Sequence, residues 1–366
     1  MRIAYDHQIF GMQSYGGISR YFSKLAQEMV KIGEDIRIFA PFYCNKYLSD
    51  LPENVVQGHF IQKFPRKTAG FFCDINRFGA RLNMNVWKPD IVHETYYSPS
   101  VTFQRRCAVV VTVYDMVHEL FPDNYFPNDS TAHAKRLAVK RADHVFCISE
   151  NTKRDLIRLL DVQVSKVSVV HLGFENSLCD YSSDYCPPSS RPYLLYVGRR
   201  SGYKNFLGLL KEVAKSELLL ADFDIVAFGG GSFSEDEQKV IHELGYRANQ
   251  VIQLGGSDDL LWSLYRSARA FIYPSLYEGF GIPPLEAMSM NCPVISSNTS
   301  SMPEVIGNAA EYFNPHNIDD MRCSIEKVVY NDGIISDLQR AGKNRLKVFS
   351  WSKCAGETDE IYRSLV

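Results

Sequence analysis

Short apolar runs rich in β-branched residues recur along the whole chain, and segments with helical spacing of apolar positions separate them. These runs cover residues 36–39, 91–93, 109–113, 145–148 and 167–171 in the first half, and 193–198, 224–228, 251–254, 270–273 and 293–296 in the second. Continuous apolar strands that alternate with helices are typical of parallel sheets covered by helices on both faces. Two such series predict two doubly wound α/β domains.

The domain boundary follows from length and local composition. A chain of 366 residues exceeds the size at which single cores stop growing. Residues 180–192 lie between the two series and are rich in Ser, Pro and Asp, which favour turns over helices. We predict a first domain over residues 1–185, a second over 186–351 and a terminal helix over 352–366, with Ser350 as its N-cap.

Composition and charge narrow the classes of function. The formal net charge is -2, which gives no general signature of nucleic-acid binding, although residues 1–172 hold 22 Lys and Arg against 17 Asp and Glu. The segment Met1 to Asp6 is too polar for a signal peptide, and no apolar run approaches the length of a membrane span. Nine cysteines without a Cys-x-x-Cys pair fit reduced thiols. We therefore expect a cytoplasmic protein.

The segment Glu278-Gly-Phe-Gly-Ile-Pro-Pro-Leu-Glu286 is the most informative part of the chain. It follows the apolar strand pattern of residues 270–274 and precedes a run that can start a helix, so its glycines lie at a strand-to-helix turn. Glycine allows close approach of the backbone, and the free N–H groups of a helix start attract phosphate oxygens. Carboxylates would repel a diphosphate but accept hydrogen bonds from hydroxyls. The pattern therefore indicates a sugar nucleotide as the ligand.

The spacing Glu-x7-Glu around Gly-Phe-Gly resembles the signature of retaining glycosyltransferases of family 4. A second similarity is Tyr193-Leu-Leu-Tyr-Val-Gly-Arg-Arg-Ser-Gly-Tyr-Lys-Asn205, which looks like the family's strand followed by Gly-Arg and Lys-Asn. The resemblance covers most of the chain and is weakest over residues 41–88 and 174–192. It implies the GT-B fold, in which two Rossmann-like domains face a central cleft. The first domain would bind the acceptor, the second would bind the nucleotide sugar, and the terminal helix would return to the first.

The resemblance also implies roles for individual residues. It implies catalytic roles for Glu278, Arg199, Lys204 and His93. Glu278 would hold the transferred sugar, Glu286 the ribose, and the cations would neutralise the diphosphate. The other donor-binding positions that it implies are Gly16, Gly17, Gly198, Gly229, Leu254, Gly279, Phe280, Gly281, Ile282 and Leu285. Asp115 and His118 form a further candidate sugar or acceptor site, although many relatives read His-Asp where this chain has Tyr114-Asp115.

Simpler interpretations stay open for most of these residues. Gly16 and Gly17 can form an ordinary turn, and Arg199 with Lys204 can be a solvated basic loop. The two glutamates can serve only the helix dipole. A lone histidine such as His93 or His118 is more often structural than catalytic.

The sequence predicts no metal and no cofactor apart from the donor itself. Asp222-Phe-Asp224 resembles the metal-binding Asp-x-Asp motif of the other large glycosyltransferase fold, but it precedes its strand instead of following it. Arg199 and Lys204 would supply the positive charge that a metal gives elsewhere. No His/Cys cluster has metal-ligand spacing.

Residues 59–88 mix aromatic residues with Lys and Arg, a composition that suits the headgroup boundary of a membrane. Burial of the aromatic residues against the sheet is the alternative. The first interpretation predicts peripheral contact with an anionic membrane at the cytoplasmic face of the inner membrane.

The sequence as a whole predicts a retaining, metal-independent glycosyltransferase. It would move a hexose, by family analogy mannose from GDP-mannose, to a lipid-linked or oligosaccharide acceptor in bacterial surface polysaccharide synthesis. An NAD-dependent oxidoreductase or epimerase with tandem Rossmann domains is one alternative, but Gly-x-Gly-x-x-Gly does not follow the first strand. A catalytically silent subunit that binds nucleotide sugars is the other.

Overall fold

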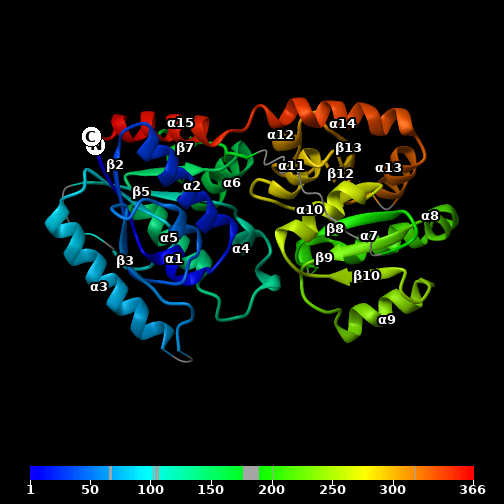
Figure 1. Ribbon diagram of the computed structural model, residues 1–366, viewed down its shortest axis with the longest axis horizontal. Coiled ribbons are helices and arrows are strands. Elements are labelled where there is room, and N and C mark those ends of the chain that lie inside the picture. The colour runs from blue at the N-terminus through cyan, green and yellow to red at the C-terminus, as the bar shows by residue number, and fades with distance from the viewer. Residues whose placement is uncertain (66–67, 102, 104–106, 176–188, 201, 318) are drawn as a thin grey trace. The chain divides into compact units, whose positions relative to one another are not determined.

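The computed structural model describes residues 1–65, 68–101, 103, 107–175, 189–200, 202–317 and 319–366 (Figure 1). The chain divides into two compact units. Unit 1 comprises Met1–Leu120, Tyr125–Gly173 and Phe349–Val366, and unit 2 comprises Phe121–Asn124 and Phe174–Val348. The boundary predicted at residue 185 lies outside the described residues.

Unit 1 contains a sheet of seven parallel strands in the order β3-β2-β1-β4-β5-β6-β7. Ile3 of the first strand pairs with Ile36 on one side and with Ile91 on the other. The chain therefore reverses its direction of travel across the sheet between β1 and β4, as in doubly wound folds. The strands are β1 (Arg2–Tyr5), β2 (Asp35–Tyr43), β3 (Val56–Phe60), β4 (Ile91–Glu94), β5 (Ala108–Val113), β6 (His144–Cys147) and β7 (Val167–Val169).

The helices of unit 1 bury one face each against this sheet. In α2, the apolar positions Phe22, Leu25 and Met29 recur at intervals of three and four residues and are fully buried. Ser350 caps the last helix by accepting a hydrogen bond from the Lys353 N–H, which confirms the predicted cap. The helices are α1 (Gln8–Met12), α2 (Gly17–Lys31), η1 (Tyr47–Asp50), α3 (Ala69–Trp87), α4 (Val117–Leu120), α5 (Thr131–Arg141), α6 (Glu150–Leu160), η3 (Val164–Lys166) and α15 (Trp351–Ser364).

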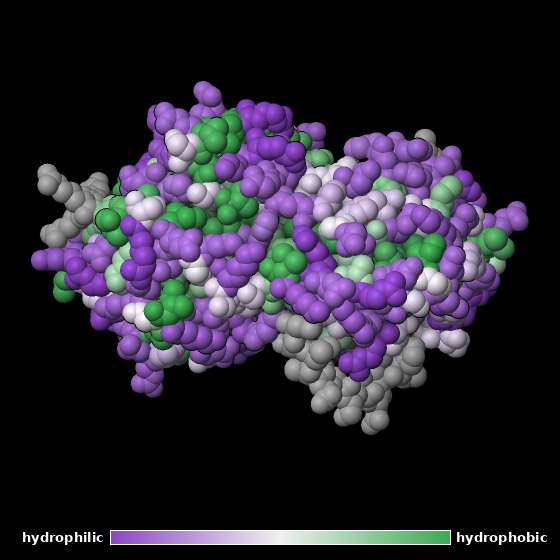
Figure 2. All heavy atoms as spheres, turned by 90° about the horizontal axis from the view of Figure 1, so that it is seen from above, coloured by the Kyte–Doolittle hydropathy of each residue, from purple (hydrophilic) through white to green (hydrophobic). Residues whose placement is uncertain are grey.

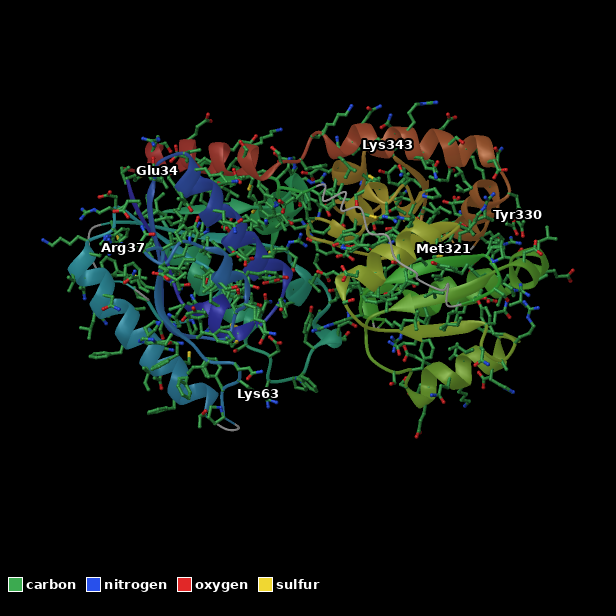
Figure 3. All side chains as sticks on the ribbon, in the orientation of Figure 1. Glu34, Arg37, Lys63, Met321, Tyr330 and Lys343 are labelled. Carbon is green, nitrogen blue, oxygen red and sulfur yellow. The ribbon has the colours of Figure 1, made fainter. Side chains whose placement is uncertain are left out.

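Helix α15 packs against α2 within unit 1. Glu34, which follows α2, joins the two ends of the chain: its carboxylate forms ion pairs with the Met1 ammonium group, 2.7 Å away, and with Arg363 of α15 (Figure 3). Tyr362 of the same helix is fully buried. The last helix is therefore part of the core of unit 1.

Unit 2 contains a sheet of six parallel strands in the order β10-β9-β8-β11-β12-β13. The direction of travel reverses between β8 and β11, so this unit is doubly wound as well. Both units thus confirm the predicted α/β class. The strands are β8 (Tyr193–Val197), β9 (Asp224–Phe228), β10 (Val251–Leu254), β11 (Ala270–Tyr273), β12 (Val294–Ser297) and β13 (Ala310–Phe313).

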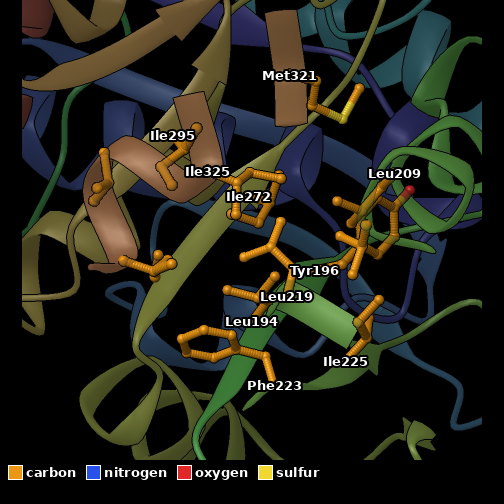
Figure 4. Packing of buried hydrophobic residues seen from close by; sticks show 14 of the residues in the cluster. Leu194, Tyr196, Leu209, Leu219, Phe223, Ile225, Ile272, Ile295, Met321 and Ile325 are labelled. Atoms are coloured by element: carbon orange, nitrogen blue, oxygen red, sulfur yellow. The ribbon is translucent and has the colours of Figure 1, made fainter. Parts of the chain in front are cut away.

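Buried aliphatic side chains join the sheet of unit 2 to its helices (Figure 4). Leu194 and Ile272 come from neighbouring strands, and Leu209 and Ile325 come from covering helices; all four are fully buried. The helices are η2 (Pro122–Asn124), η4 (Gly202–Lys204), α7 (Phe206–Ala214), α8 (Glu217–Asp222), α9 (Glu235–Glu243), α10 (Asp258–Ser267), α11 (Ile282–Ser289), α12 (Met302–Ile306), α13 (Asp320–Val329) and α14 (Asp332–Leu346).

The surface is largely hydrophilic on the face that Figure 2 displays, with small hydrophobic clusters between the charged side chains. Among the described helices, none combines the length and the apolar character needed to cross a bilayer.

Candidate active site

Strands β8 and β11 lie side by side at the point where unit 2 reverses its winding. Ligands of open α/β sheets bind outside the carboxyl ends of the strands at such a point. The loop after β8 carries Arg199 and Lys204, and the loop after β11 carries Glu278. The topology therefore brings together the two motifs that the sequence singled out.

Lys204 and Glu278 form a close ion pair across these two loops. Lys204 Nζ lies 2.7 Å from Oε1 and 2.9 Å from Oε2 of Glu278. Two further hydrogen bonds tie the loops together: Leu276 N–H donates to the Tyr203 carbonyl at 2.7 Å, and Asn205 Nδ2 donates to the Pro274 carbonyl at 3.1 Å. The two loops are therefore held together by hydrogen bonds as well as by the charges of Lys204 and Glu278.

Two serines that follow β12 hold the backbone of Glu278 in place. Its N–H donates to Ser300 Oγ at 2.8 Å, and its carbonyl accepts from the hydroxyls of Ser300 and Ser301 at 3.1 and 2.9 Å. Tyr273 at the end of β11 is fully enclosed, and burial followed by the charge of Glu278 raises its pKa. The sequence patterns did not single out these three supporting residues, because serine and tyrosine at such positions have no distinctive spacing.

The turn before α11 is built on a glycine. Gly281 adopts a φ of 107°, in the region that favours glycine, and is the N-cap residue of α11. Pro283 and Pro284 in the first turn carry no N–H. The side chains of Phe280 and Leu285 are buried, so these two residues can meet a ligand only through their backbone.

Glu286 is the fifth residue of α11, just beyond its first turn, and is half-buried. Tyr265 OH donates a hydrogen bond to its Oε2 at 3.2 Å. Burial followed by the carboxylate charge raises the pKa of Tyr265, so the phenol stays protonated and able to donate. A tyrosine hydroxyl thus orients this carboxylate.

Three predicted donor-binding positions lie together at the ends of β8, β9 and β10. Gly198 N–H donates to the Phe228 carbonyl at 2.9 Å, and Gly229 N–H donates to the Leu254 carbonyl at 2.8 Å. Gly229 has a φ of 93°, and a Cβ there would lie 3.4 Å from the Gly198 oxygen. Backbone groups of Gly198, Gly229 and Leu254 therefore lie together at this edge of the sheet.

The two adjacent arginines after β8 differ in their surroundings. Arg199 is exposed. Arg200 is 7% exposed and donates to Glu237 Oε1, the Gly229 carbonyl and the Ser232 carbonyl at 2.8, 2.8 and 2.9 Å. Arg200 is therefore held within the fold, whereas the Arg199 side chain faces solvent.

Unit 1 presents a second glycine-to-helix turn. Gly16 is the N-cap residue and Gly17 the first residue of α2. Gly17 is exposed, and a Cβ at this position would meet no atom within 4 Å. The start of α2 is therefore accessible to a ligand.

His93 is not placed as a catalytic residue. It is 0% exposed, and its Nδ1 and Nε2 lie 2.5 Å from Tyr362 OH and 2.8 Å from Thr112 Oγ1. Phe146 stacks on its ring, and burial lowers its pKa to about 3. The histidine lies inside β4, not beyond its end, and the terminal helix covers it. The predicted catalytic role is therefore wrong, and His93 is a neutral residue of the core.

Asp115 and His118 lie around a buried lysine. Lys135 has a fully buried side chain, and its Nζ donates to the Asp115 carbonyl and to Glu119 Oε2, each at 2.8 Å. His118 stacks on Tyr125 at 3.9 Å, and burial followed by the charge of Lys135 lowers its pKa. The neutral imidazole has one donor and one acceptor nitrogen, and the Asp115 carboxylate accepts hydrogen bonds from hydroxyls, so the pair remains a candidate sugar or acceptor site.

The Asp222-Phe-Asp224 segment has structural partners. Tyr330 OH donates to Asp222 Oδ2 at 2.9 Å, and Arg191 Nε lies 3.2 Å from Asp224 Oδ1 (Figure 3). Asp224 begins β9, so both carboxylates lie at the amino end of the strand, away from the edge that carries Glu278.

Comparison with known proteins identifies the family of the chain. Residues 15–178 match the family model for Glycosyltransferase Family 4, and residues 182–347 match that for Glycosyl transferases group 1. The O-antigen chain mannosyltransferase B of Escherichia coli is 28% identical over 283 residues, which cover 74% of each protein. The serotype-specific mannosyltransferase WbdA of Escherichia coli is 28% identical over 73% of this chain, but the match spans only 36% of that longer protein.

A solved structure shares the fold of the whole chain. The sucrose-phosphate synthase of Thermosynechococcus elongatus superposes with a TM-score of 0.76 and 17% identity, over 100% of this chain and 99% of that one. Since the two family models together account for nearly the whole chain and both sheets have the expected winding, the protein belongs to the GT-B glycosyltransferases, with a family 4 first half and a group 1 second half.

Proposed function

We propose that this glycosyltransferase is a retaining, metal-independent hexosyltransferase that takes mannose from GDP-mannose. The acceptor is a hydroxyl of a lipid-linked or oligosaccharide glycan in bacterial surface polysaccharide synthesis. The observation that carries the proposal is the Lys204–Glu278 ion pair at the reversal point of the second sheet. It supports the proposal because a cation, which suits a diphosphate, lies beside a carboxylate, which suits sugar hydroxyls. The names of the curated relatives support the choice of mannose.

In the proposed reaction the bond between the anomeric carbon and the diphosphate oxygen breaks. Arg199 and Lys204 neutralise the negative charge that grows on the leaving diphosphate, in the manner of other preorganised electrostatic groups. The acceptor oxygen bonds to the anomeric carbon from the same face, and its proton passes to the leaving phosphate oxygen. Glu278 accepts hydrogen bonds from sugar hydroxyls, and Glu286 accepts them from the ribose.

The decisive experiment combines donor binding with product stereochemistry. Thermal shift with GDP-mannose, UDP-glucose and UDP-galactose identifies the donor, and NMR of the product formed with a mannoside acceptor gives the anomeric configuration. We expect GDP-mannose to stabilise the protein most and the product to be the α-mannoside. A β-mannoside product would contradict the retaining mechanism. Stabilisation by a UDP-sugar alone would contradict the choice of GDP-mannose as the donor.

The same donor experiment separates the alternatives. A silent binding subunit would bind the donor but would neither transfer nor hydrolyse it. A nicotinamide-dependent oxidoreductase or epimerase would instead bind NADH and change its fluorescence, which a glycosyltransferase would not do.

We also propose that α3 contacts an anionic membrane. Phe71, Phe78, Leu82 and Val86 are 64, 66, 49 and 84% exposed, and their spacing places them on one face of the helix. By contrast, Trp87 packs against Phe39 and under Arg37, so part of the aromatic content of residues 59–88 serves the core. The predicted Arg66 and Lys67 lie outside the described residues.

Sedimentation with vesicles tests this contact. We expect the protein to pellet with phosphatidylglycerol vesicles more than with phosphatidylcholine vesicles, and a Phe78→Ser/Leu82→Ser variant to pellet less. Equal binding of the variant and the unaltered protein would contradict a role for α3.

A further inference from the structure

Unit 1 contains a cavity of ≈ 660 Å³ that none of the predicted site residues lines. Its aromatic walls are Tyr15, Tyr43, Tyr47 and Phe60. Its remaining lining is polar: Asn45, Lys46, Ser49 and Asp50.

The cavity lies at the edge of the sheet where ligands of α/β folds bind. Tyr43 is the last residue of β2, and Phe60 is the last residue of β3. Tyr15 directly precedes Gly16, the N-cap residue of α2. The cavity is therefore at the carboxyl ends of parallel strands, which is the ligand-binding edge of such sheets.

Main-chain contacts hold the walls in place. Asn45 Nδ2 donates to the Gln13 carbonyl at 2.7 Å, and Lys46 N–H donates to the Ser14 carbonyl at 3.0 Å, so the segment after β2 is bonded to the segment before α2. Tyr15 and Tyr47 pack edge to face with their centroids 5.4 Å apart. These contacts preorganise the cavity and lower the entropy cost of binding.

The side chains that line the cavity indicate which kind of ligand it can bind. Tyr15 is 60% exposed and Phe60 is 48% exposed, so large aromatic surfaces face solvent. A ligand that covers these rings removes apolar surface from water, which favours binding. The charged lining residues are one cation, Lys46, and one anion, Asp50, and Lys46 Nζ lies over the Tyr15 ring at 5.0 Å. Asp50 would repel a phosphate, and the balanced charge gives no attraction for an ion of either sign.

A hexopyranose ring fits this combination, because it has an apolar face of C–H groups and an edge of hydroxyls. The C–H face can cover the exposed aromatic rings, while the hydroxyls bond to Asp50, Ser49 and Lys46. We propose that this cavity is a subsite for a neutral sugar unit of the acceptor glycan. The proposal rests on the proposed function, since it assumes that the acceptor is a saccharide.

Saturation-transfer NMR with an α-linked mannotriose as the probe tests the subsite, with titration of GDP-mannose in parallel. We expect Tyr15→Ala and Phe60→Ala each to weaken mannotriose binding by about three- to tenfold. Donor affinity and the melting temperature should not change. Tyr330→Ala is the matched control, because Tyr330 is 46% exposed, close to the value of Phe60, but does not line the cavity.

The outcomes separate this inference from the proposed function. Unchanged mannotriose binding in both cavity variants would overturn the subsite while leaving the donor site intact. Displacement of mannotriose by millimolar inorganic phosphate would also overturn it, because a neutral sugar subsite does not bind phosphate. If the unaltered protein binds neither GDP-mannose nor another nucleotide sugar, the proposed function itself fails.

Discussion

Lys204 Nζ lies within hydrogen-bonding distance of both carboxylate oxygens of Glu278, at 2.7 and 2.9 Å, and the two side chains are only 21% and 11% exposed. At this degree of burial the attraction between the charges is only partly screened by water. A diphosphate bound at the turn would compete with Glu278 for the lysine. The pair therefore couples the group that would hold the leaving phosphate to the group that would hold the sugar.

The first prediction is that Lys204→Ala lowers turnover on the order of 10²-fold, because the lost cation acts on a leaving group whose charge grows in the transition state. Steady-state kinetics with the identified donor measures the effect. Lys215→Ala is the control, because Lys215 forms a surface ion pair with Glu212 far from the loops after β8 and β11. Near-normal turnover of Lys204→Ala would refute the phosphate assignment.

The second prediction separates two neighbouring arginines. Arg199→Ala should lower turnover with little change in stability, whereas Arg200→Ala should lower the free energy of unfolding by about 2 to 4 kcal/mol because it leaves Glu237 and two carbonyls without their donor. Urea unfolding together with kinetics measures both effects. The assignment fails if Arg199→Ala is the destabilised variant and Arg200→Ala the inactive one.

The contrast between these arginines shows what could be predicted from the sequence. The Gly-Arg-Arg motif placed both residues after a strand, but only the tertiary contacts of Glu237 show which side chain is buried. His93 illustrates the same limit. The apolar run 91–93 correctly predicted a strand, yet the burial of its histidine depends on Tyr362, 269 residues away.

Secondary structure was easiest to predict where strands are buried on both faces. Every apolar run named from the sequence corresponds to a strand, because central parallel strands consist almost entirely of apolar residues. Strands β3 and β13 were missed. Both lie at sheet edges, as the correctly predicted β7 and β10 do, but β3 reads Val-Gln-Gly-His-Phe and β13 reads Ala-Glu-Tyr-Phe, so neither is a continuous apolar run. The short β1 was missed as well, since its four residues include Arg2.

The third prediction concerns the two acids of the turn. Glu278→Gln should depress kcat with a modest change in KM, because the sugar becomes positively charged only in the transition state. Glu286→Gln should chiefly raise the KM for the donor, because the ribose undergoes no chemistry. Circular dichroism excludes misfolding. An exchange of the two kinetic patterns would reverse the sugar and ribose assignments.

The fourth prediction is that activity survives excess EDTA. In the proposed mechanism Arg199, Lys204 and backbone amides provide the positive potential at the diphosphate. Asp222→Asn provides the internal check, and its turnover should be normal because Asp222 bonds to Tyr330 at the other end of the sheet. Loss of activity in EDTA with recovery on addition of Mg²⁺ or Mn²⁺ would contradict the prediction.

The last prediction uses the burial of His93. Its pKa falls from the ordinary value of 6.5 to about 3 because burial disfavours the charged imidazole. A histidine with a depressed pKa in the folded state binds a proton more readily when the chain unfolds. Its contribution to stability is therefore fully present above pH 6.5 and is lost as the pH falls from 6.5 toward 3.

His93→Gln removes this titration while keeping a polar side chain between Thr112 and Tyr362. We expect the difference in unfolding free energy between the unaltered protein and the variant to fall by about 1.4 kcal/mol per pH unit below pH 6.5. Urea unfolding at several values between pH 7.5 and 4.5 measures it. Because His93 does not reach the surface, turnover of the folded variant at pH 7.5 should remain close to that of the unaltered protein. A large loss of turnover, together with a stability difference that does not change with pH, would contradict this assignment. It would mean that His93 acts in catalysis and that α15 moves away from β4 during the reaction.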